Sequence, residues 1–247
     1  MASGAAASDG TAGSLWFDPP VEDQDRRRQL TRERVVTEAL AVIAHDGVQA
    51  LTMRRLATRL GVVPGALYRH VNNKQQLQDL VLDNVLAEVD LHLDPAMDWT
   101  NQLKVLARRL RQVLEDHPGV AEILKTRDPL GPHSLALAEA LLEPLRAAGF
   151  GDHQAGLAFF VLVDYTIGFA VGSHASVNEQ RVRDPATRAQ LHQFLRSLPP
   201  DRFPALVALG EHVWADNRDQ RFTAGLQVLV SGLEHTRNSP TAEEGQA

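Results

Sequence analysis

Hydrophobic residues recur with the 3.6-residue period of an α-helix along most of the chain, from Thr31 to Thr236. No segment shows the sustained alternation of apolar and polar residues that is typical of a half-buried strand. The sequence therefore predicts an all-α fold, with a small three-helix unit followed by a larger helical body. The predicted divisions are a flexible arm at 1–30, the three-helix unit at 31–77, the body at 78–236 and a disordered tail at 237–247.

Capping residues set the limits of the first three predicted helices. Thr52 is a suitable N-cap, Gly61 can adopt the left-handed conformation that ends a helix, and Pro64 suits the first position of the next one. Two short helices joined by a tight glycine-containing turn, with a further helix bracing them, form a helix-turn-helix. The three helices are predicted from Thr31 to the stop at 45–47, from Thr52 to Leu60 and from Pro64 to Val71.

Breaks at proline and glycine divide the remainder of the chain, and Pro144 falls inside one of its predicted helices. The predicted helices of the body lie near 74–91, 99–116, 119–126, 134–148, 152–178, 185–197, 203–214 and 219–236.

Composition excludes several classes of protein. The 247 residues are 44% hydrophobic and include no cysteine, so disulfides and thiolate chemistry are absent and a reducing compartment is favoured. No stretch approaches about 18 to 20 uninterrupted apolar residues, and the N-terminus lacks the pattern of a signal peptide. We expect a cytoplasmic protein that does not contact a membrane.

Charge is distributed unevenly along the chain. Residues 26–74 contain ten basic and three acidic side chains, a balance of +7, whereas the whole chain has a net charge of −6. The residues outside 26–74 therefore have a net charge of −13. A basic block attached to an acidic body favours binding to phosphates, although a solvated charged face gives the same count.

Cations at the starts of two helices strengthen the case for nucleic acid. Arg54 and Arg55 occupy the first turn of the second helix, where the helix dipole disfavours positive charge by about 0.3 to 1 kcal/mol. Lys74 likewise places a positive charge at the start of the predicted fourth helix. A phosphate held by Thr52, by backbone N–H groups and by an arginine offsets this cost.

The third helix has small residues at its leading end. Pro64, Gly65 and Ala66 allow the backbone to approach base edges, and Ala66 could touch a thymine methyl group. Tyr68 and His70 are left to face the flanking DNA backbone if Leu67 and Val71 are buried. The alternative is that these two are ordinary rim residues of an amphipathic helix.

The run from Leu51 to Ala57, the turn at 60–62 and the segment Ala66-Leu-Tyr-Arg-His-Val-Asn-Asn-Lys74 resemble the DNA-binding domain of the TetR (tetracycline repressor) family, closely over residues 31–85. The resemblance implies a homodimeric repressor that leaves a palindromic operator when a small-molecule inducer binds. By this resemblance the phosphate contacts are Thr52, Tyr68, His70 and Lys74, and the residues facing base edges are Met53, Arg54, Pro64, Gly65 and Ala66.

The resemblance extends more weakly into the body, at Trp99, at 126–127, at 148–150 and at 165–168. It implies that the helices at 152–178 and 219–236 form the dimer interface and that the five helices from 74–91 to 152–178 enclose the inducer pocket. The apolar residues of 152–178 cover most of the helix circumference, which also favours burial on several sides.

The resemblance also bears on the inducer. Asp90, Ile123 and Gly172 stand where tetracycline-binding members use imidazole and carboxylate groups for a magnesium-bound drug, so another ligand is expected here, without a metal or cofactor. The candidate pocket residues are Asp164, Tyr165, His174, Ile123 and Phe160. A hydrogen-bonded core or interface aspartate remains the alternative for Asp164.

The arginines of the N-terminal arm are a separate candidate. Arg26, Arg27 and Arg28 precede the first helix, where arms of other DNA-binding domains enter the minor groove, although they could simply aid solubility.

Two other classes of protein are compatible with an all-α chain. An enzyme is disfavoured because the sequence has no HExxH, GxSxG, glycine-rich phosphate loop or paired metal-binding histidines. An all-α scaffold with a vestigial DNA-binding domain stays open, and it predicts that no discrete operator exists.

Overall fold

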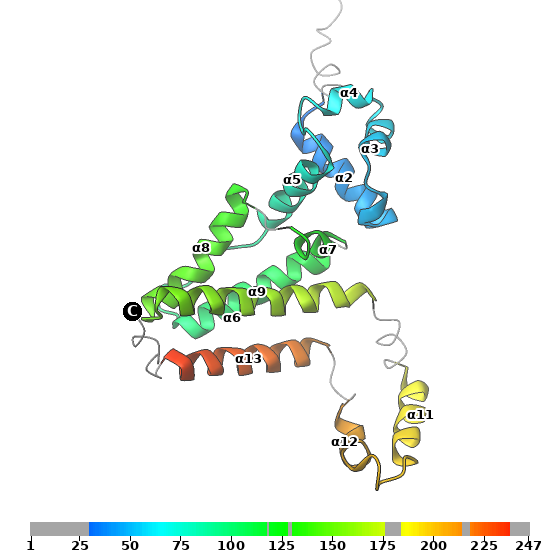
Figure 1. The fold of residues 1–247 in the computed structure, drawn as a ribbon, viewed down its shortest axis with the longest axis vertical. Helices are drawn as coiled ribbons and strands as arrows, with labels where there is room; N and C mark the ends of the chain where they lie inside the picture. Colours follow the sequence, from blue (N-terminus) through cyan, green and yellow to red (C-terminus); the bar gives the residue numbers. More distant parts are fainter. Residues whose placement is uncertain (1–29, 118, 128–129, 176–183, 214–217, 238–247) are drawn as a thin grey trace, which may run out of the picture.

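The computed structural model describes residues 30–117, 119–127, 130–175, 184–213 and 218–237. Every regular element in these ranges is helical, which confirms the all-α prediction (Figure 1). Arg26, Arg27 and Arg28 lie outside the described residues, as does the side chain of His174. The roles predicted for these four residues therefore stay predictions.

The N-terminal unit has the predicted helix-turn-helix with one additional element. Thr31 caps the first helix by accepting a hydrogen bond from the Arg34 N–H at 3.3 Å, and Gly47 ends it. A short 3-10 turn, not foreseen from the sequence, follows. The elements are α2 (Arg32–Asp46), η1 (Val48–Ala50), α3 (Met53–Leu60) and α4 (Pro64–Leu67).

Local chemistry fixes the turn between α3 and α4. The Thr52 hydroxyl accepts a hydrogen bond from the Arg55 N–H at 3.2 Å, which satisfies one of the free donors at the start of α3. Gly61 ends α3 in the left-handed region, with φ at 69°. Pro64 opens α4, as predicted.

The third predicted helix is shorter than expected, because α4 ends at Leu67 rather than at Val71. Residues 68–70 form turns in which the His70 N–H donates to the Leu67 carbonyl, three residues back, at 2.8 Å. The tighter turn still buries both Leu67 and Val71, and this is why their spacing suggested a continuous helix.

The body contains eight described helices. One of them, α5, ends at Leu86 rather than at 91, because the chain tightens there into turns with hydrogen bonds between residues three apart. The eight are α5 (Lys74–Leu86), α6 (Trp99–Asp116), α7 (Val120–Leu124), α8 (Pro132–Ala147), α9 (Asp152–Ala175), α11 (Pro185–Arg196), α12 (Pro204–Val213) and α13 (Arg218–Arg237).

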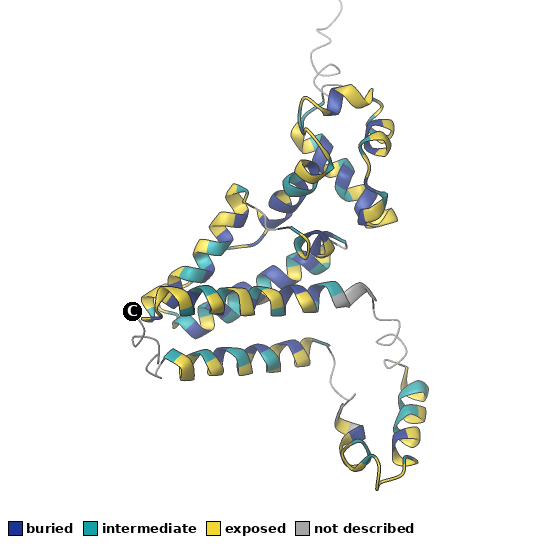
Figure 2. Cartoon of the chain, in the orientation of Figure 1, coloured by how far each residue is buried: buried dark blue, intermediate teal, exposed yellow. Residues whose placement is uncertain are grey.

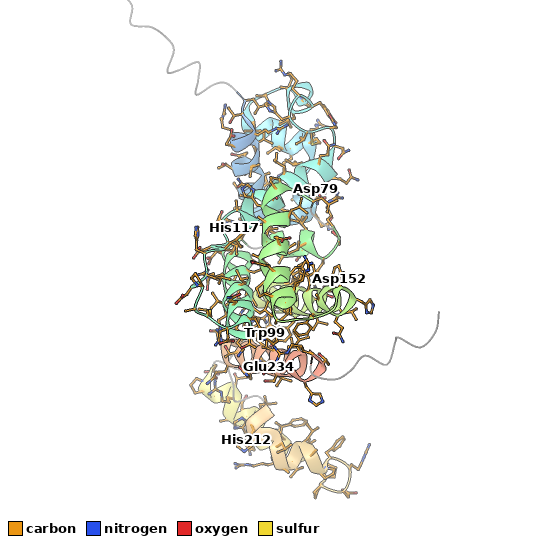
Figure 3. The ribbon with its side chains drawn as sticks, turned by 90° about the vertical axis from the view of Figure 1, so that its left-hand side faces the viewer. Asp79, Trp99, His117, Asp152, His212 and Glu234 are labelled. Atoms are coloured by element: carbon orange, nitrogen blue, oxygen red, sulfur yellow. The ribbon has the colours of Figure 1, made fainter. Side chains whose placement is uncertain are left out.

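The helix α5 joins the two halves of the molecule. It packs against α2 in the N-terminal unit and against α6, α7 and α8 in the body, so it crosses the boundary predicted at residue 77 without a break. In the side view of Figure 3, Asp79 of α5 lies beside α8, where the two halves meet.

The long helix α9 packs along α6 and also contacts α8 and α13 (Figure 1). Its segment Asp152–Val171 is long and apolar enough to cross a membrane by length and composition alone, with a mean hydropathy of 1.6, but core helices of globular proteins meet the same criteria. Only 33% of that segment is buried within the chain. Figure 2 shows the exposed positions along α9 and α13.

The helices α11 and α12 form an antiparallel pair that packs mainly on itself (Figure 1). Leu195 of α11 is buried against Gly210 of α12, where an added Cβ would lie 3.1 Å from the Leu195 Cβ. A small residue at 210 therefore allows the two helices to approach closely.

Gly119 provides a test of the packing between α7 and the N-terminal unit. Its φ is +87°, and an added Cβ would lie 2.8 Å from Cγ2 of Ile43 in α2. We expect Gly119→Ala to lower the free energy of unfolding by about 1 to 3 kcal/mol, because backbone strain and the collision act together.

Chemical denaturation of the full chain measures this change. The control is Gly65→Ala, where nothing lies within 4 Å of the added methyl group and the helix gains a better former. Equal stabilities of the two variants would contradict the packing seen at Gly119.

Candidate nucleic-acid interface and ligand cavity

The outer side of α3 is strongly basic. Arg54, Arg55 and Arg59 are all exposed, and Thr58 lies between them with its hydroxyl donating to the Arg54 carbonyl at 3.0 Å. Together with Thr52 these residues line a shallow depression in the protein surface. An anion that settles in this depression meets cationic side chains and the start of a helix at once.

Two of the three α3 arginines already have partners inside the protein. Arg55 pairs with Asp46 at the end of α2, and Arg59 pairs with Glu38 in the middle of α2. The cost of placing Arg55 in the first turn is thus offset internally, without the phosphate that the sequence suggested. Arg54 makes no ion pair with a residue in the described part of the chain and is the α3 arginine best placed to meet DNA.

The leading end of α4 presents a recognition edge that consists of Val63, Pro64 and Gly65, all exposed. Ala66 is only 9% exposed and belongs to the buried set, so it offers little surface to a base edge. Its predicted contact with DNA stays a prediction. Val63, which the sequence reasoning missed, is 72% exposed. The position of Val63, an apolar residue directly before the proline that opens α4, could have indicated its exposure.

The residues that flank α4 are accessible to differing degrees. Tyr68 is 51% exposed, whereas His70 and Lys74 are half-buried. Lys74 follows the cap of α5, where the Asn73 side chain accepts from the Gln76 N–H at 2.8 Å. Met53 in the first turn of α3 is half-buried against the core. The predicted phosphate contacts thus all keep some exposed surface.

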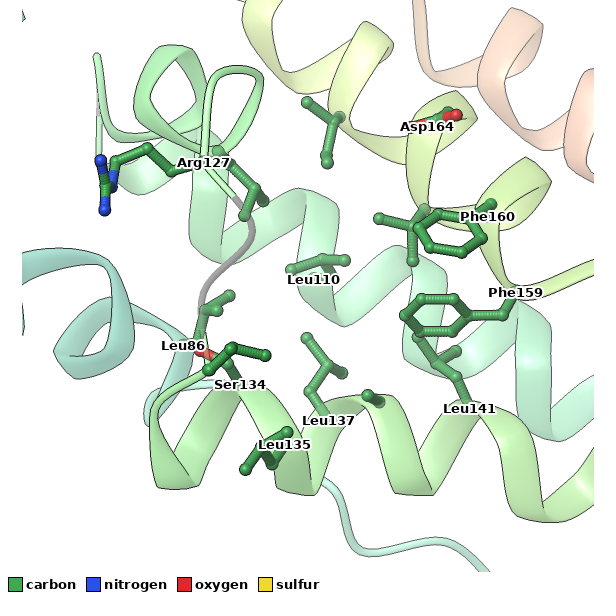
Figure 4. Close-up of a pocket in the computed structure, with 15 residues that line it drawn as sticks. Leu86, Leu110, Arg127, Ser134, Leu135, Leu137, Leu141, Phe159, Phe160 and Asp164 are labelled. Carbon is green, nitrogen blue, oxygen red and sulfur yellow. The ribbon is translucent and has the colours of Figure 1, made fainter. Parts of the chain in front are cut away.

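A cavity of about 270 Å³ opens among α5, α6, α8 and α9 in the body (Figure 4). Its lining is almost entirely apolar, and the Phe159 and Phe160 rings stand at one end, 5.2 Å apart between centroids. The lining residues are Leu86, Leu110, Leu124, Arg127, Leu130, Ser134, Leu135, Leu137, Ala138, Leu141, Phe159, Phe160, Val163, Asp164 and Ile167.

Two of the five predicted ligand residues, Phe160 and Asp164, line this cavity, and both are exposed. Ile123 is 1% exposed and lies in the core rather than in the lining. Tyr165 also lies elsewhere, because its hydroxyl donates to the Phe222 carbonyl of α13 at 2.9 Å and its ring stacks on that of Phe222. Tyr165 therefore fastens α9 to α13.

Two carboxylates of α5, one helical turn apart, bind the segments that wall the cavity. Asp79 accepts two hydrogen bonds from one edge of the Arg127 guanidinium, from Nε and from Nη2, and the Nη2 to Oδ2 distance is 2.8 Å. Asp83 accepts the backbone N–H groups of His133 and Ser134 and the Ser134 hydroxyl, each at 3.0 Å. No local sequence pattern predicts these contacts, because the partners are about 50 residues apart.

Asp83 caps the start of α8 from another helix. The residue at the N-cap position of α8 is Gly131, which has no side chain to serve as a cap, and a Cβ there would lie 2.2 Å from Oδ1 of Asp83. Burial alone would raise the pKa of Asp83, but the hydrogen bonds from Ser134 and His133 outweigh it and lower the pKa below its ordinary value.

The helix-turn-helix with its exposed basic helix, followed by a helical body with an apolar cavity, defines the class of ligand-responsive DNA-binding regulators. Two family models cover most of the chain: "Bacterial regulatory proteins, tetR family" matches residues 35–80, and "Tetracyclin repressor-like, C-terminal domain" matches residues 93–237. The chain belongs to the TetR family of transcriptional regulators.

Individual relatives agree with this assignment. An HTH-type transcriptional regulator from Saccharopolyspora erythraea is 36% identical, over 94% of this chain and 95% of its own length. The structure of ActR from Streptomyces coelicolor in complex with actinorhodin has a TM-score of 0.73 at 35% identity, covering 85% of this chain and all of its own. BioQ with its double-stranded DNA operator has a TM-score of 0.59 at 28% identity, covering 84% of this chain and 99% of its own; BioQ has also been solved from Mycobacterium smegmatis.

Asp83 should make the stability of the protein sensitive to acid. A lowered pKa in the folded state contributes stability above the unfolded value near 3.9, and that contribution is lost as the pH falls through the folded pKa. We expect Asp83→Asn to cost about 1 to 3 kcal/mol at pH 7, because a buried donor set loses its charged acceptor. The loss should shrink below about pH 4.

Urea denaturation at pH 7 and pH 3 measures both effects. Asp116→Asn is the matched control, since that exposed carboxylate accepts, within the described part of the chain, only from the Gln112 side chain at 3.0 Å. A constant difference between Asp83→Asn and the native protein at both pH values would contradict the role given to the charge.

Proposed function

We propose that this chain is a homodimeric repressor that occupies a palindromic operator and leaves it when a small molecule enters the cavity of the body. The proposal rests on the presence, in one chain, of an exposed recognition edge and a separate apolar cavity. Beside the edge, Arg54 is exposed and has no ion-pair partner among the described residues. The proposed target is DNA, so we place the protein in the cytoplasm.

The proposed DNA contacts follow the exposure of each side chain. The recognition edge and Arg54 approach base pairs in the major groove, and Met53 supports them from the first turn of α3. Thr52, Tyr68, His70 and Lys74 hold the flanking phosphates. The arginines at 26–28 add contacts from the arm. BioQ, a member with a comparable fold, has been solved with its operator.

The proposed ligand is a small molecule with a largely apolar surface. The lining offers leucines and two phenyl rings, and its one cation, Arg127, is already paired with Asp79. ActR has been solved in complex with actinorhodin, which supports a small-molecule ligand for this chain. With buried Ile123 outside the lining, a metal-bound tetracycline has no imidazole partner at that position.

The proposed dimer interface lies on α9 and α13. Exposed apolar side chains on these helices include Leu157 at 55%, Phe160 at 58%, Val161 at 44% and Val228 at 71%. Leu157, Phe160 and Val161 have the spacing i, i+3 and i+4, so they share one face of α9, and an exposed apolar patch of this kind usually marks an interface. A second copy of the chain that repeats the two helices buries this surface in a two-fold arrangement.

Selection of binding sites from random duplexes, followed by footprinting, tests the proposed function. The expected result is one palindrome whose half-sites lie about one DNA turn apart. A chain with a vestigial DNA-binding domain would instead give weak binding without a consensus sequence, and that result would overturn the proposal.

Arg54 and Arg55 are neighbours with different expected effects on DNA binding. Arg54→Ala should weaken binding to the selected operator by about 1 to 3 kcal/mol and relax the preference at one base pair. Arg55→Ala should leave the base preference unchanged and lower stability by no more than about 1 kcal/mol, because Arg55 is engaged in a largely exposed pair with Asp46. Fluorescence anisotropy on matched and mutated operators measures both variants. Equal losses of specificity would refute the distinction.

Val63 should influence operator choice. Its branched side chain is exposed directly before Pro64 and can contact a thymine methyl group. We expect Val63→Asn to leave thermal stability nearly unchanged and to alter the selected base at one position in each half-site. Repeating the site selection with the variant measures this, and an unchanged consensus would exclude Val63 from recognition.

The dimer interface can be tested with two valines of almost equal exposure. Val228→Glu should raise the dimer dissociation constant at least about tenfold, because the interface would bury an unpaired charge. Val63→Glu, at 72% exposure on the DNA-binding unit, should leave dimerisation unchanged. Sedimentation velocity over a concentration series distinguishes the two. Unchanged association of the Val228 variant would place the interface elsewhere.

A further inference from the structure

We propose that Asp83 is the residue through which occupancy of the cavity acts on the DNA-binding unit, because its carboxylate binds the start of α8, which walls the cavity, to α5. The inference rests on the proposed function, since it assumes that the cavity receives the inducer. It assigns a positioning role to a side chain that contacts neither the cavity nor the recognition edge.

The geometry of the contact makes α5 and the start of α8 move together. Three hydrogen bonds of 3.0 Å converge on Oδ1 of Asp83, from two backbone N–H groups and one hydroxyl, while the His133 ring lies 3.0 Å from Oδ2. Hydrogen bonds to a buried carboxylate are among the strong ones in proteins. Gly131 is the residue whose lack of a side chain makes room for this carboxylate.

The cavity shares its wall with this contact. Ser134, which donates to Asp83, also lines the cavity, together with Leu135 and Ala138 on the next turns of α8. A ligand that pushes these side chains outward must either stretch the bonds to Asp83 or move α5 with the start of α8. The strength of the bonds favours the movement of α5.

Movement of α5 reaches the DNA-binding unit directly. The helix begins three residues after the turns that follow α4, and it packs on α2 with Leu77 and Val81 fully buried. A shift of α5 therefore changes the position of the recognition edge relative to the body, and in a dimer it changes the separation of the two edges.

A tryptophan built into the cavity wall replaces the unidentified ligand in the test. Ala138→Trp adds bulk inside the cavity, whereas Ala136→Trp adds the same bulk on an exposed position of α8 outside the lining. Each is made in the native, Asp83→Asn and Asp116→Asn backgrounds of the full-length chain. The two readouts are amide hydrogen exchange in α5 and affinity for the selected operator.

In the native and Asp116→Asn backgrounds, Ala138→Trp should change α5 exchange at least about threefold and operator affinity about fivefold or more, as expected for allosteric coupling. Ala136→Trp should change neither. In the Asp83→Asn background, both effects of Ala138→Trp should be less than half as large as in the native background. Gly131→Ala, which displaces the carboxylate without removing it, should reproduce the loss.

Two results would overturn the proposal. One is no effect of Ala138→Trp in the native background. The other is an equal effect with and without Asp83, which would assign the coupling to Leu86, the α5 residue that lines the cavity itself. Because hydrogen exchange needs no DNA, it decides the proposal even if site selection finds no operator and the proposed function fails.

Discussion

The buried carboxylate of Asp83 must be satisfied by donors, and all the donors it finds belong to the start of α8. This requirement fixes how α5 and α8 meet. It also determines where the cavity lies, because Ser134 and the following turns of α8 form one of its walls. The bidentate pair of Asp79 with Arg127 ties the preceding loop to the same helix. The helices α6, α7 and α8 of the body thus pack on α5, which also packs on α2 of the DNA-binding unit.

The arginines of α3 fall into two groups, those that pair with α2 and one that faces the solvent. Arg55 and Arg59 hold α3 against α2 through Asp46 and Glu38, whereas Arg54 is left to the solvent side. A count of positive charges over this segment therefore overstates the number available to phosphates. Exposed pairs of this kind contribute little to stability individually, but they orient the helix that carries Arg54.

The sequence predicted the parts of the fold that depend on local chemistry. Thr52, Gly61 and Pro64 set the helix-turn-helix because capping and backbone preferences act within a few residues. The errors concern tertiary contacts. The periodicity of Leu67 and Val71 did not distinguish a helix from a tight turn, and composition did not show that Tyr165 faces α13 while Asp164 faces the cavity. The hydrogen bonds of Asp83 join residues about 50 positions apart, and a local sequence pattern cannot predict such contacts.

The recognition edge also has an evolutionary consequence. Val63, Pro64 and Gly65 are exposed, and the buried core of the unit is built from other residues. After gene duplication, one copy can therefore change Val63 or Gly65 without first acquiring compensating mutations in its core, while Pro64 keeps its role in opening α4. Divergence of target sites among paralogues would then be limited by selection on the promoters they control rather than by folding.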